Sequence, residues 1–202
     1  MKRLAFLSAL FVSTLSVSTA SAAVVAGAAI PDRPSGNVEM IFSVDPALQC
    51  YYTARDSVDL RYGLEHCDLA MRNPLMNFRA QTVLNRGIIR YAMGDRSGAL
   101  NDFKNALDYD PSMGDAYLSQ AQVLVAEKRP DDALAAINQG IAMGARNLHV
   151  AYYSRGEIEE DAGRFALAYR DYKRALVIKP DYAPALRQLA RFKVVPKNTP
   201  TQ

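Results

Sequence analysis

The residues that most resemble a catalytic pair are a neighbouring histidine and cysteine. His66 stands directly before Cys67, and His149 is the one other histidine in the chain. A cysteine nucleophile needs a base within hydrogen-bond reach, but adjacent residues on a helix point in different directions. His149 opens an apolar helical pattern, which is typical of a surface residue at a helix start. We therefore expect no catalytic residue in this chain.

An acidic run is the second group whose chemistry needs an explanation. Glu157, Glu159, Glu160 and Asp161 crowd into residues 157–161. A cation site needs several oxygens around one point, whereas a helix spreads these carboxylates along a solvated face. The sequence also lacks CxxC, HExxH and GxSxG motifs and a glycine-rich phosphate loop. It predicts no metal site and no cofactor.

The two cysteines, Cys50 and Cys67, are the third candidate for chemistry. In an oxidising compartment a pair at this spacing is typical of one disulfide. In the chain-entropy model, closing such a loop stabilises a fold by about 3 kcal/mol. We predict a disulfide between Cys50 and Cys67, with two buried free thiols as the alternative.

An internal repeat indicates which elements position these residues. Residues 85–111 align with residues 154–180 at an offset of 69, so that glycines, alanines, aromatic residues and prolines recur in the same order. Examples are Gly87 with Gly156, Phe103 with Tyr172, and Pro111 with Pro180. Half of this offset predicts a middle copy. Residues 114–148 supply it, although Lys128 stands where the other copies have glycine and Gly140 replaces an alanine.

This pattern resembles the tetratricopeptide repeat, a helix–turn–helix unit of about 34 residues. The first copy carries Val83, Gly87, Gly94, Ala99, Phe103, Ala106 and Pro111, and the third carries Tyr152, Gly156, Gly163, Ala168, Tyr172, Ala175 and Pro180. Small residues allow the two helices of a unit to cross closely, and a glycine turns the chain between them. The resemblance implies an all-α superhelix, a solenoid of about three full repeats, because single hairpins must stack to bury their apolar faces.

The repeats set the expected domain boundaries. The chain divides into a signal peptide (1–22), a flexible leader (23–43), a repeat domain (44–195) and a disordered tail (196–202). The domain comprises a diverged hairpin (44–77), three repeats (80–113, 114–148 and 149–182) and a capping helix (182–192). In that capping helix we expect Leu186 and Leu189 to face inward, and Arg187, Gln188 and Arg191 to face outward.

The resemblance also implies a binding surface, because the first helix of each repeat in this family lines a concave groove. We expect an apolar floor, neighbouring amides and hydroxyls, and an acidic far end. Asn85 would hydrogen-bond either a ligand backbone or a neighbouring helix. The predicted groove residues are Leu84, Asn85, Ile88, Tyr91, Leu118, Ser119, Gln122, Val125, Tyr153, Ser154 and Glu157.

The first residues indicate export. Lys2 and Arg3 precede an apolar stretch padded with Ser and Thr, and Ala20-Ser21-Ala22 is a small-x-small cleavage site. This is the pattern of a secretory signal peptide; an uncleaved anchor is the alternative. Cleavage removes two of the 24 basic residues and none of the 21 acidic ones, so the net charge falls from +3 to +1. We expect a periplasmic protein without stable membrane insertion, and no basic patch suggests nucleic acid as a partner.

These features favour a non-catalytic scaffold or adaptor that binds a peptide or protein segment in its groove. An extended or helical segment, apolar with some basic character, would fit the groove. A carboxylate clamp is disfavoured, because the basic residues that family members use for it are missing. One alternative is a self-associating structural protein, a homo-oligomer that uses its own leader, especially residues 38–42. The weakest alternative is an envelope hydrolase, since fold alone does not exclude activity.

Overall fold

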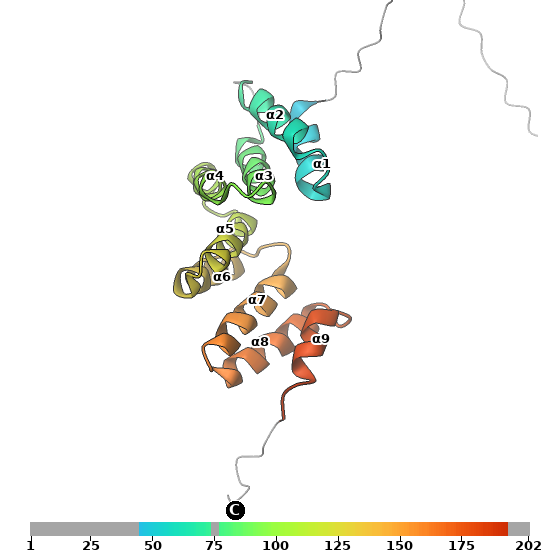
Figure 1. The fold of residues 1–202 in the computed structure, drawn as a ribbon, viewed down its shortest axis with the longest axis vertical. Helices are drawn as coiled ribbons and strands as arrows, with labels where there is room; N and C mark the ends of the chain where they lie inside the picture. The colour runs from blue at the N-terminus through green and yellow to red at the C-terminus, as the bar shows by residue number, and fades with distance from the viewer. Residues whose placement is uncertain (1–44, 74–76, 194–202) are drawn as a thin grey trace, which may run out of the picture. The chain divides into compact units, whose positions relative to one another are not determined.

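The structure is a computed structural model that describes residues 45–73 and 77–193. The signal peptide 1–22, the leader 23–43 and the tail 196–202 that the sequence predicts lie outside these residues. Within them, all regular structure is helical (Figure 1). The helices are α1 (Pro46–Asp56), α2 (Leu60–Met71), α3 (Arg79–Ala92), α4 (Arg96–Tyr109), α5 (Gly114–Ala126), α6 (Pro130–Ala142), α7 (Leu148–Asp161), α8 (Phe165–Ile178) and α9 (Ala183–Leu189).

The helices pack in chain order as stacked hairpins. α1 packs on α2, α3 on α4, α5 on α6, and α7 on α8, and each hairpin contacts the next element along the chain (Figure 1). The described residues therefore confirm the predicted fold: three full repeats between a diverged N-terminal hairpin and a C-terminal capping helix. The segment α9 is the capping helix.

Glycines allow the two helices of each outer repeat to approach closely. A Cβ atom at Gly87 would lie 2.5 Å from the ring of Phe103, and one at Gly156 would lie 2.7 Å from the ring of Tyr172. Both aromatic side chains are fully buried. Since no real Cβ sits that close to a carbon, glycine is required at both crossings for the aromatic rings to fill the core.

The turns between the paired helices use the left-handed backbone region. Gly94 and Gly163 have φ angles of 88° and 73° between the helices of the outer repeats. Lys128 occupies the same place in the middle repeat with a φ of 60°. A side chain with a Cβ is disfavoured there by roughly 1–2 kcal/mol. The turn at Lys128 is therefore strained, whereas the turns at Gly94 and Gly163 are not.

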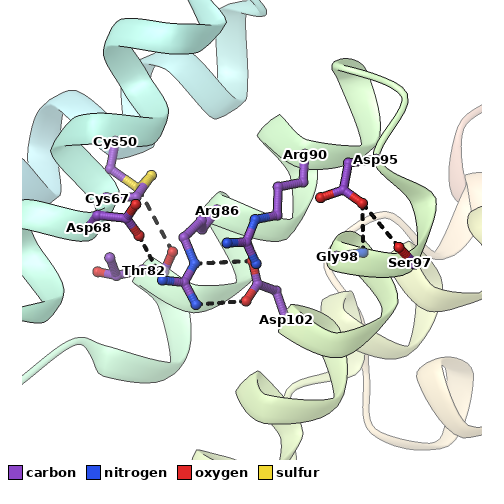
Figure 2. A network of polar contacts seen from close by, with 10 residues as sticks. All are labelled: Cys50, Cys67, Asp68, Thr82, Arg86, Arg90, Asp95, Ser97, Gly98 and Asp102. Carbon is purple, nitrogen blue, oxygen red and sulfur yellow. Dashed lines mark hydrogen bonds and ion pairs between the residues drawn. A yellow bond between two sulfur atoms is a disulfide. The ribbon is translucent and has the colours of Figure 1, made fainter.

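A buried arginine–aspartate pair, which was not predicted from the sequence, joins the two helices of the first full repeat. Asp102 on α4 has no exposed surface, and Arg86 on α3 donates to both its carboxylate oxygens, at 3.0 and 2.7 Å (Figure 2). Arg86 also reaches Asp68 on α2 at 2.7 Å, and Arg90 donates to Asp102 at 2.8 Å. The bidentate geometry compensates the burial of the Asp102 charge.

The third repeat contains the same pair. Arg155 on α7 donates to both oxygens of Asp171 on α8, each at 2.8 Å, and to Asn138 on α6 at 2.6 Å. Arg86 and Arg155, like Asp102 and Asp171, are related by the same offset of 69 that relates the glycines. The recurrence of an arginine and an aspartate at this offset is the signal in the sequence that would have identified the pair.

The diverged N-terminal hairpin is held by a disulfide between its two helices. The sulfur atoms of Cys50 on α1 and Cys67 on α2 are 2.12 Å apart, at disulfide distance, and both residues are fully buried. They pack with Ile89 of α3, and Cys50 Sγ lies 3.7 Å from the carbonyl oxygen of Thr82 (Figure 2). The disulfide therefore lies where the hairpin meets the first full repeat.

The capping helix is rotated from its predicted orientation. Leu189 packs against the core, but Leu186, which we expected to face inward, is 47% exposed. Ala185 is fully buried instead. Residues 185 and 189 are one helical turn apart and share a face, so the prediction for Leu186 was wrong by one position on the helix.

Candidate functional site

A cavity of about 530 Å³ lies between α5, α7 and the segment around α9. Its apolar lining comes largely from α5 and from the start of α7, and includes Leu118, Val125 and Val150. Its charged lining comes from the end of α7 and from the capping segment. α5 and α7 are not among the closely packed pairs of described helices, which leaves this space open between the second and third full repeats.

Six of the eleven predicted groove residues line this cavity. They come from three repeats, and together they form both its apolar and its polar parts. Val125 is 47% exposed and Gln122 is also exposed, so both present surface that a ligand can contact. The six are Tyr91, Leu118, Gln122, Val125, Ser154 and Glu157.

The predicted residues on the first half of α3 lie elsewhere. Leu84 and Asn85 are buried, with 1% and 4% of their surface exposed. Leu84 packs in the core with Ile88 against it, and Asn85 Oδ1 accepts a hydrogen bond from Gln81 at 3.1 Å. The reason is that α3 has neighbours on two sides, since α1 packs directly on it and α5 also contacts it. These residues offer little surface to a partner.

Ser119 and Tyr153 are half-buried and satisfied within their own helices. Ser119 Oγ donates to the carbonyl oxygen of Asp115 at 2.9 Å. The Tyr153 hydroxyl donates to Glu157 Oε1 at 2.7 Å, and the Tyr153 ring packs beside those of Tyr172 and Tyr182. Neither residue lines the cavity, although Tyr153 orients a side chain that does.

The end of α7 makes one part of the cavity acidic. Glu157, Glu160 and Asp161 all line it. Glu160 accepts a hydrogen bond from the Tyr172 hydroxyl at 2.7 Å and pairs with Arg191 at 3.0 Å. With three carboxylates and one guanidinium, this part of the wall carries a net negative charge. The acidic run that the sequence placed on a solvated face therefore contributes to the cavity instead.

Burial changes the proton affinities of the groups around this acidic part. The pKa of Glu157 is raised, first because burial disfavours its charged form and then because Asp161 and Glu160 lie nearby. Burial also raises the pKa values of Tyr153 and Tyr172, and their hydrogen bonds to Glu157 and Glu160 raise them further. Both tyrosines are therefore neutral donors that hold carboxylates without cancelling their charge.

Two lining residues come from a segment that the sequence analysis assigned to the outer surface. Gln188 and Arg191, expected to face outward, line the cavity opposite α7. Their placement follows from the rotation of α9, which turns Ala185 and Leu189 into the core. Leu189 faces the core as expected, and the burial of Ala185 in place of Leu186 marks the rotation.

The cysteine and histidine residues considered as candidates for catalysis lie outside the cavity and make structural contacts. Cys67 belongs to the disulfide, and His66 Nδ1 lies 2.8 Å from the carbonyl oxygen of Tyr62. His149 packs edge-on against Tyr182. In residues 45–73 and 77–193, no group of three or more His, Cys, Asp or Glu side chains is placed to hold a metal ion. No helix in these ranges has the length and apolar character needed to cross a membrane.

Comparison with known families agrees with the repeat pattern. Residues 84–147 match the family model described as the tetratricopeptide repeat. The match covers parts of the first and second full repeats. No curated protein sequence matches the chain.

Solved structures with this fold are numerous, and three of them illustrate its range. PilW, a type IV pilus biogenesis factor, superposes with a TM-score of 0.64 at 22% identity, over 72% of this chain and 66% of that one. The first repeat domain of Spaghetti (RPAP3), solved with an HSP90 peptide, has a TM-score of 0.53 at 22% identity, over 57% and 90%. YrrB, described as having an unusual peptide-binding site, has a TM-score of 0.56 at 17% identity, over 69% and 70%. At these identities the likeness concerns the fold.

Proposed function

We propose that this chain, a tetratricopeptide-repeat protein, is a non-catalytic scaffold that holds a segment of a partner protein in the cavity between α5, α7 and α9. Proteins of this repeat type are generally scaffolds for protein interactions. Of the structures with the same fold, that of Spaghetti (RPAP3) was solved with an HSP90 peptide, and YrrB has an unusual peptide-binding site. That likeness supports the class of function, and the cavity suggests where it takes place.

The observation that carries the proposal is the character of the cavity wall. Leu118, Val125 and Val150 present an apolar surface, and Gln122 and Ser154 place an amide and a hydroxyl beside it. Polypeptide ligands combine apolar side chains with backbone groups that need hydrogen-bond partners. A cavity of about 530 Å³ has room for a few side chains of such a segment.

The same wall argues against a partner held by its C-terminal carboxylate. Family members that grip such a group use Lys, Asn and Arg, and the matching Asn85 is buried and hydrogen-bonded to Gln81. Among the described residues that line the cavity, the one arginine is Arg191, and it is paired with Glu160. An internal segment of a partner is therefore the better candidate than its terminus.

The proposal includes export to the periplasm. Its support is the signal-peptide pattern of residues 1–22 and the disulfide between Cys50 and Cys67, a bond that persists in oxidising compartments. The test is to express the full chain in a Gram-negative host and sequence the N-terminus of the protein recovered from the periplasm. We expect it to begin at Ala23. Protein found only in the cytoplasm with its first residues intact would exclude export.

Groove binding is tested by site-specific photocrosslinking in cells. One variant carries the crosslinking residue at Val125, on the cavity wall, and its control carries it at Val177, which is 72% exposed on α8 and does not line the cavity. We expect a discrete protein adduct from position 125 that is absent from position 177. The same adducts from both positions, or none from position 125, would remove the cavity as the binding site.

A further inference from the structure

We infer that the acidic part of the cavity receives a lysine or arginine side chain of the bound segment, and that Glu157 is the residue that pairs with it. This inference rests on the proposed function and deepens it, because it states which residue type the partner must present. A shallow apolar groove accepts many sequences, whereas a carboxylate inside it selects a cation.

The first argument is an imbalance of ion pairs on α7. Glu159 pairs with Arg164, and Glu160 pairs with Arg191. Glu157 and Asp161 form no ion pair with any residue that the structure describes. Glu157 is half-buried, so its charge has lost part of its hydration without gaining a cation. A ligand cation would supply the missing partner.

The second argument is that the Glu157 carboxylate is held in place. Its Oε1 accepts a hydrogen bond from the Tyr153 hydroxyl at 2.7 Å. The Tyr153 ring is itself fixed between Tyr172, at 5.7 Å between ring centroids, and Tyr182, at 5.5 Å. A carboxylate positioned in this way loses little conformational entropy when it pairs with a ligand. Tyr153 is thus a positioning residue for Glu157.

The third argument is the charge of the surrounding wall. The three carboxylates of Glu157, Glu160 and Asp161 face one guanidinium, that of Arg191, so the site remains anionic after its internal pair is counted. Apolar residues of α5, Leu118 and Val125, line the same cavity. A segment that places an apolar side chain against α5 and a basic one against α7 satisfies both.

The alternative reading is that Glu157 only anchors the Tyr153 hydroxyl. A variant separates the two roles, because a glutamine at position 157 keeps an oxygen that can accept from Tyr153 but removes the negative charge. Equal melting temperatures of the wild type and Glu157→Gln would show that the fold tolerates this change.

The experiment selects a display library of random linear peptides on the full mature chain. Three variants are compared with the wild type: Glu157→Gln, Val125→Lys on the apolar wall, and Val177→Lys as a matched control away from the cavity. We expect wild type and Val177→Lys to retain peptides that combine apolar residues with Lys or Arg. We expect Glu157→Gln to lower the enrichment of basic over neutral peptides by about tenfold, the effect of one partly desolvated ion pair.

The outcomes separate the two proposals. If Glu157→Gln keeps the same preference for Lys and Arg, or if the wild type has no such preference, the cation site is wrong while groove binding stands. If Val125→Lys retains the same peptides as Val177→Lys, or if the wild type retains none, the proposed function itself is wrong. Loss of peptides in Val125→Lys together with loss of basic preference in Glu157→Gln supports both.

Discussion

The two outer repeats and the middle repeat use different residues to pack their paired helices together. In α3–α4 and α7–α8, a glycine faces a buried aromatic ring, and an arginine bridges to a buried aspartate. In α5–α6, Ala121 and Ile137 occupy the positions of the glycine and the aromatic residue. Gln120 and Ala136 occupy the positions of the arginine and the aspartate. The middle repeat thus has an aliphatic core in place of the buried arginine–aspartate pair, and its ion pair between Arg146 and Asp115 lies nearer the surface.

A second difference between the repeats concerns close contacts. Gly140 stands where the outer repeats have Ala106 and Ala175, and a Cβ at Gly140 would lie 2.6 Å from Leu118 Cδ2. The glycine therefore makes room for Leu118, a residue of the cavity wall. An open cavity of about 500 Å³ also lies beside Gln120 and Ala136, between α4 and α6, at the place where an arginine bridge would connect these helices.

The difference suggests that the outer repeats and the middle repeat have different roles. The outer repeats contain the polar and aromatic contacts that tie neighbouring helices together. The middle repeat provides a large part of the apolar wall of the cavity, through Leu118 and Val125. Because the repeats have equivalent positions, residues can be exchanged between the outer and the middle repeats to test this comparison.

The largest expected effect comes from removing the bridge of the third repeat. Arg155→Met leaves the buried carboxylate of Asp171 without its bidentate partner, and removing one member of a buried pair costs roughly 3 kcal/mol or more. The measurement is the free energy of unfolding in urea. Arg170→Met, at an exposed position on α8, the helix that carries Asp171, is the matched control. Equal losses in the two variants would contradict the bridge.

The equivalent ion pair in the first repeat provides a second test. Arg86→Met should cost less than Arg155→Met, because Arg90 still donates to Asp102 at 2.8 Å. The double variant Arg86→Met with Arg90→Met should then lose more than the two single variants combined. Additive losses would show that the two arginines act independently.

The next effect is on the crossing of α7 and α8. Gly156→Ala places a Cβ against the Tyr172 ring and should cost about 1–2 kcal/mol, since overpacking outweighs the gain in helix propensity. Adding Tyr172→Ile copies the Ala121–Ile137 pair of the middle repeat. A double-mutant cycle should show that this second change costs less with Ala at position 156 than with Gly. No coupling would mean that the two residues are not matched.

A smaller effect is expected from building a bridge into the middle repeat. Ala136→Asp alone buries an unpaired carboxylate and destabilises the fold, whereas adding Gln120→Arg should recover about 1 kcal/mol through the pairing seen in the other repeats. Unfolding free energies of the two single variants and the double variant measure this coupling. Zero coupling would indicate that α5 and α6 are placed differently from their equivalents.

The smallest expected effect concerns the turn of the middle repeat. Lys128→Gly relieves a left-handed backbone at a φ of 60° but adds disorder to the unfolded chain, so we expect a gain of about 0.5 kcal/mol. Gly94→Lys, the reverse exchange in the first repeat, should lose more than that. A rise in melting temperature for the first variant and a fall for the second is the expected pair of results.

Much of the fold was predictable because the repeat encodes contacts that are local. Gly87 and Phe103, or Gly156 and Tyr172, belong to one hairpin, and their spacing is set by two helices and a turn. The candidate site was only partly predictable. Six predicted residues line the cavity, while Leu84 and Asn85 are buried, because packing between non-adjacent helices decides which positions on α3 remain accessible.

The sequence by itself determined the class of the fold, the order of its hairpins and the proximity of Cys50 and Cys67, since these depend on periodicity and short spacings. Only the tertiary structure decided how far α1 covers α3, which way α9 turns, and that Glu157 and Arg191 meet at one cavity. Those features depend on how whole helices pack across the stack. Small rotations of a helix exchange buried for exposed positions without altering the repeat pattern.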